Sequence, residues 1–147
     1  MRRLLLLPLF VLACTAKEEA APATEEAAAP AGISADQVAG NWTGRTMAEA
    51  SDSVLSEWNL TWNADGSGTV SYTTGTSPAT PFTTVFAGDS IVGTSAPHPD
   101  PATGATVTWT SVGRMNADGT MSGMVTVMDS TGAAVMRGRW SASRAAM

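Results

Sequence analysis

The chain has 147 residues, which is enough for one domain with a single core, and 13 acidic against 8 basic residues give it a net charge of −5. This acidic balance argues against nucleic acid as a partner, because phosphate backbones are bound by clusters of Lys and Arg. With one cysteine, the chain has no intrachain disulfide and no zinc site built from several thiolates.

The first fourteen residues have the pattern of an export signal. Arg2 and Arg3 precede an apolar run from Leu4 to Leu12, and the small residue Ala13 stands directly before Cys14. The run is too short for a membrane span, which takes about 20 apolar residues. We therefore expect residues 1–13 to be a signal peptide.

The end of this signal, Val11-Leu12-Ala13-Cys14, resembles the lipobox of bacterial lipoproteins. In that family the Cys thiol receives a diacylglycerol and becomes the first residue of the mature chain. The resemblance implies a lipidated Cys14, contact with the membrane through this lipid, and a place in the cell envelope. Thr15 and Ala16 follow the cysteine, where an Asp would mark inner-membrane retention, so the resemblance implies an outer-membrane anchor facing the periplasm.

Residues 14–32 are expected to form a disordered tether that starts at the lipidated Cys14. After the cysteine the segment is almost entirely Ala, Glu, Pro and Thr, with too little apolar surface to offset the entropy of ordering. Pro22 and Pro30 interrupt the helix that its Ala and Glu content would otherwise favour. Without Arg2 and Arg3 the mature chain would have six basic and thirteen acidic residues, a net charge of −7.

Residues 33–147 form the predicted domain. It begins with a short helical turn, because Ser34 and Gln37 have the spacing of a capping box and Gly40 can end the turn. After that, apolar residues alternate with polar ones, as where Trp58 and Trp62 flank Asn59 and Thr61. Eight strands are predicted, at residues 40–47, 54–63, 68–75, 81–87, 89–95, 104–115, 119–128 and 133–143.

Two copies of the turn Asn-Ala-Asp-Gly, at 63–66 and 116–119, predict hairpins. They lack the spacing and the bidentate Glu of a calcium loop, so Asp65 and Asp118 are interpreted as turn residues. The fold class is therefore all-β. We expect an eight-stranded antiparallel up-and-down barrel after the helical turn, because the connections are short, with an open sandwich as the alternative.

The triplet Gly40-Asn41-Trp42 after the helical turn is similar to the start of lipocalin-like (calycin) barrels, and Gly-x-Trp-Thr is similar to avidin-type barrels. The resemblance implies that Trp42 packs at the closed end, away from a ligand, under Arg144 or Arg139 as a cation–π partner. It also implies that the loop from Thr46 to Ser53 lies at the open mouth as a lid.

Candidate chemistry is sparse. His98, the sole histidine, lies between prolines in a loop that we expect to be stiff and exposed, and no nucleophile accompanies it. The methionines near the C-terminus could bind Cu(I), but strand alternation turns Met121 away from Met124 and Met128, which favours packing. We expect no enzyme, no cofactor and no metal site.

Two function classes remain open. The first choice is a structural or interaction module of the cell envelope, because side chains can fill an eight-stranded barrel. The alternative is a carrier for a small apolar or amphipathic ligand, and an internal cavity would distinguish the two. The residues expected to line such a site are Trp58, Trp62, Tyr72, Phe82, Phe86, Trp109 and Met121.

Overall fold

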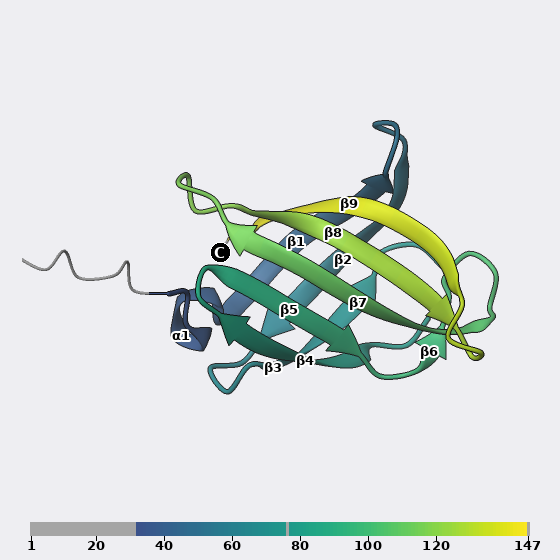
Figure 1. The fold of residues 1–147 in the computed structure, drawn as a ribbon, viewed down its shortest axis with the longest axis horizontal. Coiled ribbons are helices and arrows are strands. Elements are labelled where there is room, and N and C mark those ends of the chain that lie inside the picture. The colour runs from purple at the N-terminus through teal and green to yellow at the C-terminus, as the bar shows by residue number, and fades with distance from the viewer. Residues whose placement is uncertain (1–31, 76, 147) are drawn as a thin grey trace, which may run out of the picture.

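The computed structural model describes residues 32–75 and 77–146. The predicted signal peptide, Cys14 and nearly all of the tether lie outside these residues. One short helix, α1 (Ala35–Val38), precedes nine strands (Figure 1). The strands are β1 (Gly40–Ala48), β2 (Val54–Trp62), β3 (Ser67–Tyr72), β4 (Thr80–Ala87), β5 (Ser90–Ser95), β6 (His98–Pro99), β7 (Thr106–Met115), β8 (Met121–Asp129) and β9 (Ala134–Arg144).

The strands form a closed antiparallel barrel. Consecutive strands from β1 to β5 pair with one another, β5 pairs with β7, and β7, β8 and β9 continue to β1, which closes the ring. The two-residue strand β6 pairs only with the start of β7. The predicted all-β, eight-stranded up-and-down barrel is therefore confirmed, and the short β6 is the one strand that the sequence did not predict. Closure leaves the main strands without an exposed edge.

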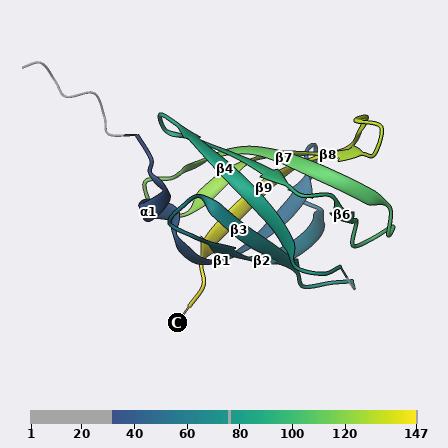
Figure 2. The same ribbon diagram turned by 90° about the horizontal axis from the view of Figure 1, so that it is seen from below.

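Alternation along each strand separates the interior from the surface. On β2, Trp58 and Trp62 are buried while Glu57 and Asn59 are exposed. The same period of two places Val107 and Trp109 inside on β7. The two ends of the barrel differ: α1 lies at one end and β6 at the other (Figures 1 and 2).

The Asp-Gly turns have the structure expected of tight hairpin turns. Asp65 accepts hydrogen bonds from the Ser67 amide and hydroxyl, and Asp118 accepts the same pair from Thr120. The glycine after each aspartate has a φ near +80°, a conformation that disfavours other residues. These hydrogen bonds lower the pKa of both carboxyls, which are fully exposed.

Among the described residues, no helix has the length and apolar composition needed to cross a membrane.

Candidate functional site

The barrel encloses a cavity of about 560 Å³. All five tryptophans of the chain contribute to its wall, together with aliphatic side chains from every main strand except β1 and β4. From β4, the aromatic side chain of Phe82 lines the cavity. The aromatic lining residues are Trp42, Trp58, Trp62, Tyr72, Phe82, Trp109 and Trp140.

Six of the seven predicted lining residues meet at this cavity. They are Trp58, Trp62, Tyr72, Phe82, Trp109 and Met121. The seventh, Phe86, is half-buried near the closed end, where its ring lies beside Gly66 in the β2–β3 turn, and it does not line the cavity. The alternation along β4 correctly predicts that Phe86 points inward. Along the barrel axis, however, Phe86 lies nearer to α1 than the cavity does.

Trp140 lines the cavity although it is not among the residues predicted from the sequence. It is buried and packs edge-on against Trp58, with ring centroids 6.4 Å apart. Arg137 and Arg139 precede it in the sequence, and these two charged residues make the apolar face of β9 hard to recognise. The alternation of Gly138, Trp140 and Ala142, all buried, is the signal that could have identified it.

Glycines on neighbouring strands determine how the rings lie. Gly44 pairs with Trp58 across β1 and β2, and a Cβ at Gly44 would lie only 2.6 Å from Cζ2 of that ring. Gly68 is opposite Phe82, where a Cβ would lie 2.6 Å from Cε1. Each ring therefore rests directly on the backbone of the next strand. The rings lie along the wall, which leaves the centre of the barrel open.

Two of the indole N–H groups form hydrogen bonds with other residues of the barrel wall. Trp58 donates from Nε1 to the Thr46 hydroxyl at 3.1 Å, and Trp140 donates from Nε1 to the Met124 carbonyl at 3.2 Å. These bonds fix the orientation of both rings and keep their N–H groups out of the cavity. The exposed part of the lining is consequently mostly apolar.

The closed end is built on Trp42. Its ring is fully buried, its Nε1 donates to the Val38 carbonyl at 2.7 Å, and the Arg144 guanidinium lies 4.6 Å from the ring centroid. Arg144 also donates to the carbonyls of Ala39 and Gln37, which ties α1 to β9. The predicted cation–π partner is thus Arg144 and not Arg139. Trp42 also forms part of the cavity lining, and its predicted separation from a bound ligand stays a prediction.

His98 lies at the opposite end, at the mouth. It is only 5% exposed, and its ring stacks on Tyr72 with centroids 5.9 Å apart. Its Nδ1 lies 3.0 Å from the Ala96 carbonyl, which can only accept, so in the neutral ring Nε2 can accept from the Tyr72 hydroxyl 3.4 Å away. The expectation of an exposed loop histidine is wrong, because β6 pairs with β7 and turns His98 inward.

Tyr72 shares this environment. Burial raises the pKa of Tyr72 to about 12, and the negative charge of Asp100 acts in the same direction. The hydroxyl is therefore a neutral donor and acceptor at the mouth under ordinary conditions.

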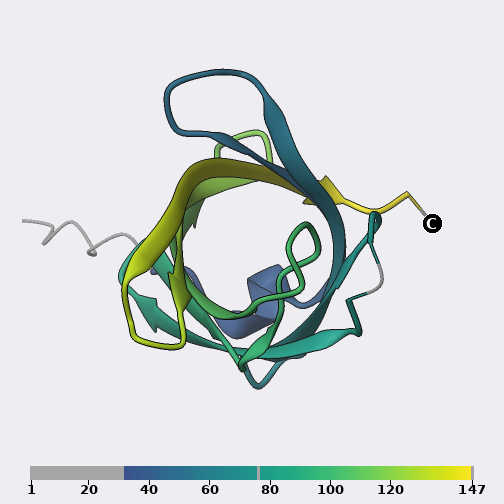
Figure 3. The same cartoon turned by 90° about the vertical axis from the view of Figure 1, so that its right-hand side faces the viewer.

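The loop between β6 and β7 covers part of the mouth. Seen along the barrel axis, it projects across the opening (Figure 3), and Asp100, Pro101, Ala102, Thr103 and Ala105 all line the cavity. Asp100 organises the loop from within, because its Oδ1 accepts from the amides of Ala102 and Thr103 and from the Thr103 hydroxyl.

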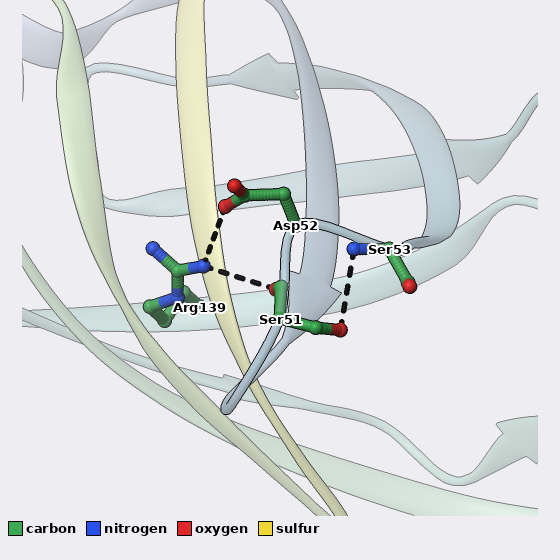
Figure 4. A network of polar contacts seen from close by, with 4 residues as sticks. All are labelled: Ser51, Asp52, Ser53 and Arg139. Atoms are coloured by element: carbon green, nitrogen blue, oxygen red, sulfur yellow. Dashed lines mark hydrogen bonds and ion pairs between the residues drawn. The ribbon is translucent and has the colours of Figure 1, made fainter.

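The loop between β1 and β2 is at the same end as the mouth but leans outward from the barrel wall (Figure 3). Arg139 on β9 holds it there by donating to the Ser51 carbonyl and the Asp52 carboxylate, both at 3.0 Å (Figure 4). None of residues 47–54 lines the cavity. The loop predicted at Thr46–Ser53 therefore lies at the predicted end of the barrel but does not cover the cavity, and the covering loop is the one that follows β6.

The lining contains four titratable side chains: Tyr72, His98, Asp100 and Asp129. Within residues 32–75 and 77–146, no three His, Cys, Asp or Glu side chains come together in a way that could hold a metal ion. The arrangement is that of a mostly apolar pocket with a few polar groups at its opening.

Comparison with protein-family models, curated proteins and solved structures finds no match to this chain. The closed eight-stranded barrel with α1, Trp42 and Arg144 at one end is consistent with the lipocalin-like resemblance of the sequence.

Proposed function

We propose that the domain binds a small apolar or amphipathic molecule inside the barrel, without a catalytic step. The observation that carries this proposal is the cavity of about 560 Å³. Ligand pockets in proteins occupy about 300–1,000 Å³ and are lined mainly by apolar and aromatic side chains with a few polar groups. A barrel of eight strands can be filled by side chains or can hold one small ligand. The rings that rest on Gly44 and Gly68 favour the second case.

The test is a pair of phenylalanine substitutions on neighbouring residues of β7. Ser111 lines the cavity, whereas Val112 is 50% exposed on the outside of the same strand. Ser111→Phe should fill the interior and abolish binding of an apolar probe, while Val112→Phe should bind like the wild type.

Binding is measured by tryptophan fluorescence and by thermal shift. A ligand at 100 times its Kd adds about 2.7 kcal/mol to the free energy of unfolding. Failure of a panel of neutral aromatic and aliphatic probes to bind would overturn the proposal. Equal binding by both phenylalanine variants would show that the probes bind elsewhere.

We further propose that a lipid on Cys14 anchors the protein to the outer membrane, facing the periplasm. The support is the lipobox-like Val11-Leu12-Ala13-Cys14 and the absence of Asp at position 15. Mass spectrometry of membrane-extracted protein should find a chain that begins at acylated Cys14. Cys14→Ser should release the protein from the membrane fraction and Thr15→Ser should not. An unmodified thiol would refute this proposal.

A structural or interaction module is the second candidate. The observation that favours it is a row of apolar side chains on the outer face, where Val85, Val92, Val112 and Met124 are successive cross-strand partners on four strands. Val85 is 66% exposed. If a second copy of the chain covers this row, analytical ultracentrifugation should find a dimer that Val112→Lys dissociates. A monomer at all concentrations would count against it.

A further inference from the structure

We propose that the cavity selects uncharged or positively charged ligands and rejects carboxylates, sulfonates and phosphates. This inference rests on the proposed ligand-binding function and adds the chemical class of the ligand. It follows from the charges at the mouth, where Asp100 and Asp129 both line the cavity.

The two aspartates are placed at the same rim by strand pairing. Val107, near the start of β7, is opposite His98 of β6 on one side and opposite Asp129 of β8 on the other. Asp100 follows β6 by one residue. The two carboxylates therefore flank the first residues of β7, at the end of the barrel through which a ligand must pass.

Each carboxylate is held in place by its own turn. Asp129 accepts through Oδ1 from the Thr131 amide and hydroxyl and from the Ala133 amide, and these bonds lower its pKa. Asp100 accepts three hydrogen bonds through Oδ1 within the covering loop. For both residues the second oxygen receives no hydrogen bond from the described residues, and neither carboxylate forms an ion pair with a described cation.

Positive charge is kept away from the lining. None of the five arginines in the described part of the chain is among the cavity residues. Arg144 is committed to the closed end, and Arg139 is committed to Asp52 on the outside. The other three are exposed: Arg45, Arg114 and Arg137.

An anionic ligand would therefore lose solvation without meeting an arginine, and the lining offers it only isolated neutral donors such as the Tyr72 hydroxyl and Trp62 Nε1. Burying an ionised group is costly unless an opposite charge or several hydrogen-bond donors receive it. Here the head group would also meet the two negative charges of Asp100 and Asp129 at the mouth, which repel it. A neutral ligand meets neither penalty, and the aromatic faces of the wall can also attract a cation.

The experiment uses two probes that share one ring skeleton. N-phenyl-1-naphthylamine is neutral, whereas 8-anilino-1-naphthalenesulfonate carries a sulfonate, and both become fluorescent in an apolar site. Titrations are run at low salt, so that the charges at the mouth are screened as little as possible. Signal that remains in Ser111→Phe is subtracted as binding outside the cavity.

We expect the neutral probe to bind at least about tenfold more tightly than the sulfonate. The double variant Asp100→Asn, Asp129→Asn should bring the two affinities together, because Asn keeps the Oδ1 acceptor and removes only the charge. Asp118→Asn is the matched control. Asp118 lies in a turn of the same kind at the closed end and does not line the cavity. The ratio of the two probe affinities in Asp118→Asn should therefore equal that of the wild type. Added salt should reduce the difference between the two probe affinities in the wild type, because it screens the charges at the mouth.

The outcomes separate this inference from the function on which it rests. If neither probe binds in the cavity, the proposed function fails and the inference fails with it. If both bind equally well, the function stands and the inference is overturned. If the sulfonate is rejected but the double variant does not restore it, the rejection does not come from these aspartates and the inference is overturned. Retained binding of the neutral probe shows that the double variant is folded.

Discussion

Replacement of Gly44 by alanine should destabilise the barrel and shrink its cavity, although alanine is the smallest possible addition. The new Cβ would lie 2.6 Å from Cζ2 of Trp58, so the ring must leave the wall. The ring can move only inward, which strains its bond from Nε1 to the Thr46 hydroxyl. Overpacking of this kind costs about 1–3 kcal/mol, and an unpaired buried N–H costs about as much again.

Alanine also offsets part of this loss, because it orders more easily in a strand than glycine, by about 0.5–1 kcal/mol. We therefore expect the free energy of unfolding to fall by about 3 kcal/mol. Urea denaturation followed by circular dichroism measures this change without relying on the altered tryptophan. Affinity for a neutral probe should fall as well, since Trp58 now occupies part of the cavity.

The decisive control is Gly44→Ala in a variant that lacks the Trp58 ring. In a Trp58→Leu background, Gly44→Ala should be neutral or slightly stabilising, so that the double-mutant cycle gives a coupling of at least about 1.5 kcal/mol. If Gly44→Ala costs the same in both backgrounds, the clash with the ring is not its cause. The account of how the cavity is kept open would then be refuted.

Three further results are expected. Trp42→Ala should lower the free energy of unfolding by about 3–5 kcal/mol in urea denaturation, because a fully buried ring is lost, and a change below about 1 kcal/mol would contradict its role at the closed end. The pKa of Tyr72 is raised by burial to about 12, so the folded state keeps its proton longer than the unfolded state; its contribution to stability is complete below about pH 10 and is lost as the pH rises towards 12. Tyr72→Phe should flatten the decline of the melting temperature across that window, and an unchanged slope would count against it. Asp118→Ala should lower the melting temperature at neutral pH, because hydrogen bonds from Thr120 depress the pKa of Asp118; this difference should narrow as the pH falls below the ordinary value of 3.8, and a constant difference would contradict it.

The strand pattern of this barrel could be predicted from the sequence because it depends on local alternation. Trp58 and Trp62 share a face at spacing of four residues, and turn residues such as Asp65-Gly66 mark where strands end. The helical turn and the place of Trp42 follow from equally local signals, namely the capping box and the triplet that opens β1. These features require no knowledge of which strands are neighbours.

Height along the barrel axis could not be predicted in this way. Phe86 has the correct inward direction on β4, yet it lies beside the β2–β3 turn instead of the cavity. The strands of a barrel are tilted and staggered, so the depth of a residue depends on the register between all strands together. His98 fails for a related reason: its flanking prolines favour a loop, and only the long-range pairing of β6 with β7 turns it inward.

The cavity itself depends on a pattern that links distant positions. Side chains can fill an eight-stranded barrel, and the aromatic residues predicted to point inward fit a packed interior and a hollow one equally well. The rings lie along the wall because Gly44, Gly68 and Gly113 are placed beneath Trp58, Phe82 and Trp140. Alanine or valine at those three positions would fit the same strand pattern and predict the same fold. Whether the barrel is hollow is therefore determined by which residues face each other across strands, and this becomes visible only once the register is known.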